Sequence, residues 1–196
     1  MRNIYIILIM ISSFTILSCA KKSSTSSTAT TTTELEGTWV TNCYASGSSY
    51  YIQTIIVSGT DISKKKEQHT DSSCSTDYVL WEDTYDSLSI GDEVTFADNT
   101  KGHKFTSEVV SFKLTLQNAS AVSTSNTADL CGYSDWALNN AKDYTGKTCG
   151  STAYPVANTS IQGLYNLVGN NLFIGTLSTT GSYPTVVSTS ITYVKQ

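Results

Sequence analysis

Cysteine is the residue type in this chain whose chemistry is easiest to constrain. A thiol can form a disulfide, bind a metal ion or carry a lipid. The five cysteines are Cys19, Cys43, Cys74, Cys131 and Cys149. In an exported protein an odd number leaves one thiol outside any set of disulfides. We therefore expect one cysteine to have a chemistry of its own, and its neighbours in the sequence indicate which one.

The N-terminal segment has the layout of a secretory signal peptide. Arg2 is the only charged residue before an apolar run from Ile4 to Leu17. This run of about 14 residues is too short to cross the ~30 Å hydrocarbon core of a bilayer as a helix. Small residues follow it, as they do at signal-peptide cleavage sites. Secretion is therefore predicted, and a short membrane-spanning anchor is the alternative.

The end of the apolar run, Ile16-Leu17-Ser18-Cys19-Ala20, resembles the lipobox of bacterial lipoproteins. In that family the cysteine receives a diacylglyceryl group before the signal peptide is cut. The resemblance implies a signal peptide over residues 1–18 and two or three acyl chains, palmitate among them, on Cys19. Two or more chains hold a protein firmly to a membrane. We expect a lipid-anchored protein of the cell envelope, most readily in the outer membrane. The sequence leaves open whether the domain faces the periplasm or the cell surface.

Assigning Cys19 to the lipid leaves an even set of four cysteines in an oxidising compartment, where disulfides form and persist. Ordinary cleavage with a free Cys19 is the alternative, and the odd total argues against it. Four cysteines allow three pairings. We favour Cys43 with Cys74 and Cys131 with Cys149, because each pair closes a short loop. A zinc site competes, but the chain lacks Cys-x-x-Cys spacing.

Other residue types that support catalysis or metal binding do not fall into a recognisable pattern. The two histidines, His69 and His103, lie in no motif with a nucleophile or a metal-ligand spacing. We expect both to be solvated. The acidic clusters near Glu82 and Asp92 match no calcium loop. The sequence therefore predicts no catalytic residue, metal or cofactor, and an enzyme is the least favoured class.

The charge of the chain disfavours a nucleic-acid partner. The net charge is −4. Loss of residues 1–18 removes Arg2 and leaves 11 basic and 16 acidic residues, a net charge of −5. Mild acidity favours solubility over binding to nucleic acid or anionic lipid. The one basic cluster, Lys64-Lys65-Lys66, is predicted to be a solvated loop or strand edge.

Two segments follow the lipobox. Ten of the eleven residues from Ser23 to Thr33 are serine or threonine, so no apolar periodicity can offset the entropy of ordering this part. Residues 19–34 are therefore predicted to be the lipidated cysteine and a flexible tether. Residues 35–196 are long enough for one domain with a sizeable core.

The domain has the pattern of an all-β protein. Apolar and polar residues alternate from Val110 to Leu116, with the period of two that is typical of a strand. Gly169-Asn170 between two apolar runs predicts a hairpin, and turns are also predicted at Ser58-Gly59, at Gly91-Asp92 and over residues 98–102. We expect eight or nine strands in an antiparallel up-and-down barrel. One long disulfide-locked interruption, over about residues 118–157, carries the predicted short helix at Ser134–Lys142.

Gly37-Thr38-Trp39 at the start of the domain resembles the Gly-x-Trp of lipocalin-like barrels. The resemblance implies that Trp39 closes one end of the barrel and that a basic residue near the C-terminus, Lys195, packs over its ring. It also implies a small apolar or amphipathic ligand inside the barrel.

The chain is also similar to a set of uncharacterised bacterial lipoproteins. The shared motifs are Gly-Thr-Trp-x-x-x-Cys at residues 37–43, Asp-x-x-Cys at 71–74, Cys-Gly-x-x-x-Trp at 131–136 and Cys-Gly at 149–150. That set carries no activity that could be transferred. Two functions therefore remain open: ligand binding inside the barrel, or a surface interaction and structural lipoprotein with a filled barrel and partner-binding loops.

Overall fold

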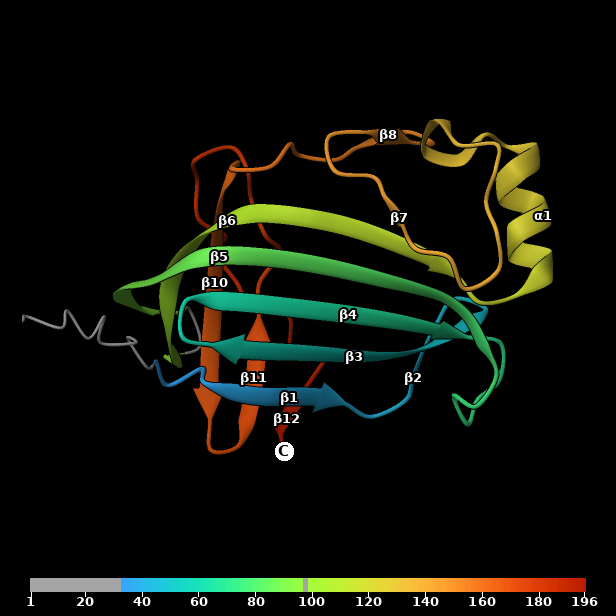
Figure 1. The fold of residues 1–196 in the computed structure, drawn as a ribbon. Helices are drawn as coiled ribbons and strands as arrows, with labels where there is room; N and C mark the ends of the chain where they lie inside the picture. Colours follow the sequence, from blue (N-terminus) through green and yellow to red (C-terminus); the bar gives the residue numbers. More distant parts are fainter. Residues whose placement is uncertain (1–32, 97–98) are drawn as a thin grey trace, which may run out of the picture.

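A computed structural model describes residues 33–96 and 99–196. The predicted signal peptide, Cys19 and nearly all of the predicted tether lie outside these residues. The described part is built mainly of strands, with short helices only in one long connection. Figure 1 shows the strands β3 to β6 side by side, with β10 and β11 running behind them at a steep angle.

Eight strands form a closed antiparallel barrel, so the predicted fold class is confirmed. They are β1 (Gly37–Thr41), β3 (Ser49–Ser58), β4 (Asp61–His69), β5 (Asp77–Thr95), β6 (Lys101–Leu116), β10 (Ser160–Val168), β11 (Asn171–Ile174) and β12 (Tyr193–Lys195). Each pairs with the next one in this order, and both β12 and β3 pair with β1. This closes an up-and-down barrel and leaves none of the eight at a free edge, as closure requires.

Four shorter strands extend or decorate the barrel. β2 (Tyr44–Ser46) continues the pairing with β3 beyond the end of β1. β7 (Lys142–Asp143) pairs with the end of β6, and β8 (Thr148–Cys149) pairs with β9 (Thr152–Ala153) in a separate small sheet.

The predicted turns are confirmed at three positions and wrong at one. The Gly169-Asn170 hairpin joins β10 to β11, and Gly169 adopts a positive φ of 61° as the first turn residue, as in turns of type II′. Ser58-Gly59 ends β3, and residues around Asn99 connect β5 to β6. Gly91-Asp92 instead lies within β5, where the pairing with β6 shifts register between Ile90 and Glu93. Such irregularities bend a strand without ending it.

Residues 117–159 form one long connection between β6 and β10, which we call the covering segment. In Figure 1 it runs above β6 and past the right-hand end of that strand. It carries α1 (Ala119–Thr127) and the short 3-10 helix η1 (Leu130–Gly132). Within the described residues no helix has the length and apolar character needed to cross a membrane.

The covering segment contains a short helix as predicted, but its predicted position at Ser134–Lys142 is wrong. The helix begins after Asn118, whose extended backbone and side-chain oxygen, which accepts a hydrogen bond from the Ser120 N–H, make it the N-cap. Over residues 134–142 the chain instead folds back onto α1, because the Trp136 N–H and C=O bond the Asn126 side chain. Lys142 then joins β7.

Both predicted disulfides are present in the structure. Cys43 pairs with Cys74 across 31 residues, and Cys131 pairs with Cys149 across 18. The first joins the chain after β1 to the connection between β4 and β5. The second joins η1 to β8 and therefore crosslinks the covering segment to itself.

The core consists of two groups of buried side chains. One lies within the barrel around Trp39 and Tyr165. The other lies between the covering segment and β5 and β6, with Phe112, Leu114 and Trp136 among its members. The covering segment is thus packed against the barrel strands through its own apolar core.

Candidate functional site

The barrel holds a partly open cavity of about 650 Å³, within the ~300–1,000 Å³ that small-molecule sites occupy. Its apolar wall comes from five barrel strands. The residues of this wall are Ile55, Val57, Ile62, Phe105, Phe112, Ile161, Leu172 and Ile174. We call this space the barrel cavity.

Strand alternation decides which side chains reach the barrel cavity, because successive side chains point to opposite faces of a sheet. Val57 is buried and lines the cavity, whereas its neighbour Ile56 is exposed. The register carries the same face from strand to strand: Val57 pairs with Ile62 of β4, which pairs with Tyr85 of β5. All three line the cavity.

A glycine opposite a phenylalanine contributes to the shape of this interior. Gly163 of β10 pairs with Phe105 of β6, and a Cβ atom at Gly163 would lie 2.1 Å from the Phe105 ring. The ring therefore lies across the glycine backbone, and a larger residue at position 163 would displace it.

The cavity also has a charged side. Lys64 and Lys66 of β4 and Asp83 of β5 line it, together with Tyr85 and Tyr154. Burial raises the pKa of Asp83 above its usual range, which Lys64 and a hydrogen bond from the Tyr85 hydroxyl partly oppose. Burial lowers the pKa of Lys66, and the nearby charge of Lys64 lowers it further. Here the structure corrects the sequence prediction: only Lys65 of the basic cluster faces outward, where it forms an ion pair with Glu82 at 3.4 Å.

Three further polar side chains of the interior are paired within the protein. The Tyr193 hydroxyl donates to Gln53 Oε1 at 2.8 Å, and the Gln53 N–H donates to the Thr41 hydroxyl. The Tyr165 hydroxyl donates to Glu34, the last residue of the expected tether, so that packing extends one residue before Leu35. These groups stabilise the barrel and leave the lysines as the distinctive polar feature of the cavity.

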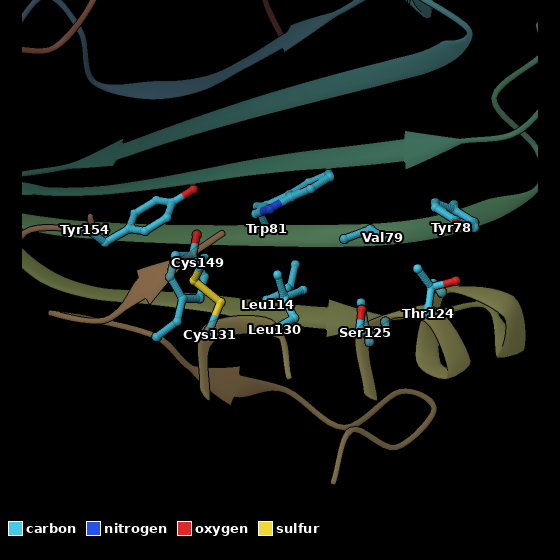
Figure 2. Close-up of a pocket in the computed structure, with 13 residues that line it drawn as sticks. Tyr78, Val79, Trp81, Leu114, Thr124, Ser125, Leu130, Cys131, Cys149 and Tyr154 are labelled. Atoms are coloured by element: carbon cyan, nitrogen blue, oxygen red, sulfur yellow. A yellow bond between two sulfur atoms is a disulfide. The ribbon is translucent and has the colours of Figure 1, made fainter. Parts of the chain in front are cut away.

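A second, smaller cavity of about 270 Å³ lies under the covering segment. Figure 2 shows Val79, Trp81 and Leu114 on the barrel strands facing Leu130 and the Cys131–Cys149 disulfide. Tyr154 lines both cavities. The smaller cavity carries no charged side chain.

Trp39 is buried in the core of the barrel. Its ring is 1% exposed, and its Nε1 donates to the Leu35 carbonyl at 2.7 Å. Lys195, which pairs with Trp39 in the sheet and is exposed, has its Nζ 5.0 Å from the ring centroid. The ring therefore lies just beneath the surface, under the Lys195 side chain.

The two histidines lie on different strands and differ in burial. His69, the last residue of β4, is 4% exposed, so its predicted solvation is wrong. It lies between Tyr50 of β3 and Asp77 of β5, with Nδ1 3.2 Å from the Asp77 carboxylate. His103 is partly exposed and stacks on Tyr165. Neither histidine lines the barrel cavity.

No protein-family model matches the chain, and no curated protein matches it. Within residues 33–96 and 99–196, no three of the His, Cys, Asp and Glu side chains are grouped so that they could hold a metal ion. The functional argument therefore rests on the geometry of the barrel cavity.

Proposed function

We propose that this protein is a lipid-anchored lipoprotein of the cell envelope whose barrel binds a small apolar or amphipathic ligand. The observation that carries this proposal is the barrel cavity of about 650 Å³ with its apolar wall. Protein interiors are normally packed to the density of organic crystals. A space of this size among apolar side chains therefore supports a role as a binding site.

The hydrophobic effect supplies the affinity. Each methylene moved from water to an apolar wall contributes about 0.8 kcal/mol. The closed ladder of eight strands holds the wall in place, so little ordering accompanies binding. The alternative function, a partner-binding lipoprotein, rests on a barrel filled by its own side chains, and the cavity argues for the first function over the second.

The anchoring part of the proposal rests on the lipobox and on the cysteine arithmetic. Both disulfides use the other four cysteines, which leaves Cys19 without a partner among them. In a bacterial host with lipoprotein-processing enzymes, Cys19→Ser is expected to leave uncleaved precursor and to abolish metabolic labelling with palmitate. A Cys43→Ser variant, the control, should remain labelled. Persistent labelling of Cys19→Ser would exclude this anchor site.

The binding part can be tested on the secreted chain from residue 20 onward, which keeps every residue that the structure describes. We expect a fluorescent long-chain fatty acid, its methyl ester, or both to bind with micromolar dissociation constants. Val57→Trp, which fills the cavity from the inner face, should weaken binding at least tenfold. Ile56→Trp, on the outer face one residue away, is the matched control and should not.

Fluorescence titration gives the dissociation constants, and the absence of free thiols with an unchanged circular dichroism spectrum verifies folding. Failure of both probes to bind the folded protein would refute the proposed function. Equal weakening by Val57→Trp and Ile56→Trp would refute the barrel cavity as the binding site.

A further inference from the structure

The two lysines on the charged side of the barrel cavity come from one strand, β4, whose side chains point alternately inward and outward. Lys64 and Lys66 lie on the inner face of β4, while Lys65 between them lies on the outer face. In the register, Lys64 pairs with Asp83 and Lys66 pairs with Trp81 of β5. Two lysine side chains therefore leave the same face of β4 along the cavity wall.

These two lysines lack the close partner that an outward lysine has. Among the described residues, no carboxylate lies within 4.0 Å of the ammonium of Lys64 or Lys66. Asp83 interacts with both at longer range, and its carboxylate accepts a hydrogen bond from the Tyr85 hydroxyl. The two positive charges are thus only partly compensated.

The charges that line the cavity do not balance. Its described lining contains Lys64, Lys66 and Asp83 as the charged side chains, which gives a net charge of +1 when all three are ionised. The chain as a whole has a net charge of −4. An acidic protein therefore carries a positive interior, and a cation would be a poor ligand for it.

Aromatic rings hold one of these lysines in place. Lys66 Nζ lies 4.4 Å from the centroid of the Tyr51 ring and 5.3 Å from that of Trp81. Cation–π contacts of this kind stabilise an ammonium without neutralising its charge. Partial burial of an unneutralised charge is unfavourable, and a bound anion would offset that cost.

Most of the remaining wall of the cavity is apolar. Ile55 and Val57 of β3 continue from the lysines, and Phe105, Ile161 and Leu172 complete the opposite strands. A ligand that fits both parts has a charged head and an apolar body.

We propose that the ligand of the barrel cavity is an amphipathic molecule with one negative charge, of which a long-chain carboxylic acid is the simplest example. Its carboxylate lies at Lys64 and Lys66, and its apolar chain lies along Ile55, Val57 and Leu172. This inference rests on the proposed function and specifies the class of ligand.

The experiment compares a fluorescent long-chain carboxylic acid with its methyl ester on the secreted chain from residue 20 onward at pH 7. The acid is expected to bind at least tenfold more tightly than the ester. Lys64→Gln/Lys66→Gln should remove this preference and leave the affinity for the ester within about twofold. Lys65→Gln removes one positive charge from the outer face of the same strand and should keep the preference.

The outcomes separate the two proposals. If neither probe binds, the proposed function fails, and the inference fails with it. If acid and ester bind with equal affinity, or if Lys65→Gln weakens acid binding as much as the double variant does, only the ligand class is overturned. Should the double variant fail to fold, the ratio of acid to ester affinity in the unaltered protein and in Lys64→Gln alone still decides.

Discussion

Trp39→Ala is expected to lower the free energy of unfolding by about 3–5 kcal/mol, the range for removing a fully buried large aromatic side chain. The tryptophan ring is 1% exposed and packs in the barrel core with Leu35 and Ile55. Alanine would leave a cavity there and would also leave the Leu35 carbonyl without its hydrogen bond from Nε1. The contact with Lys195 would be lost as well.

Urea unfolding followed by circular dichroism measures this loss. The free energy of unfolding of Trp39→Phe should lie between those of the unaltered protein and Trp39→Ala, because phenylalanine keeps an aromatic ring but removes the indole donor. Trp81→Ala, at a partly buried ring beside the smaller cavity, should cost less than Trp39→Ala. A loss below about 1 kcal/mol for Trp39→Ala would mean that the ring does not close the barrel, since a buried aromatic residue cannot be removed so cheaply.

Cys131→Ala/Cys149→Ala is expected to cost about 3 kcal/mol of unfolding free energy and to loosen the covering segment. In the chain-entropy model the cost follows from the loop of 18 residues that the disulfide closes. The disulfide joins η1 to β8 and lines the smaller cavity. Its removal should therefore increase amide hydrogen exchange over residues 117–159 more than in the barrel strands.

The other disulfide supplies the matched control. Cys43→Ala/Cys74→Ala opens a loop of 31 residues and should cost a similar or slightly larger free energy, but it should leave exchange in the covering segment unchanged. Equal exchange in both double variants would contradict the role we assign to Cys131–Cys149. Both measurements use the chain from residue 20 onward.

Loss of that disulfide should also affect ligand binding through Tyr154. This residue follows β9 in the covering segment and lines both cavities. A looser covering segment would expose the charged side of the barrel cavity to water, which screens the attraction between the lysines and an anionic head group. The disulfide thus connects stability of the covering segment to the proposed binding site.

The sequence by itself determined the strand content, the order of the strands and the cysteine pairing. Alternation up to Leu116 and the turn residues at Gly59 and Gly169 are local signals, and β6, β3–β4 and β10–β11 follow them. Val110, the first residue of the predicted alternation, is instead exposed, because the pairing with β5 shifts register beside it. Where the connections are short turns, up-and-down order follows from them, because consecutive strands joined in this way pair with each other. The long connections from β6 to β10 and from β11 to β12 carry no such local signal. The disulfides follow the same logic, since each joins cysteines that are near neighbours among the four.

Helix position and side-chain burial were decided only by the tertiary structure. The sequence from Ala119 to Thr127 is rich in serine and threonine and has little intrinsic helix preference, so α1 depends on its N-cap Asn118 and on packing against β6. His69 gave no apolar signal because its burial comes from its neighbours on β3 and β5.

The lysines of the barrel cavity show most clearly that side-chain burial depends on the tertiary structure. Alternation states that Lys64 and Lys66 share one face of a strand and that Lys65 lies on the other, but three identical residues cannot indicate which face is inside. Closure of the barrel decides it, because the register with Ile55 and Gln53 of β3 fixes the inner face of β4. The chemistry of the site thus depends on pairing between strands, and Ile62, which alternation places on the same face as Lys64 and Lys66, is a local sign of which face is inside.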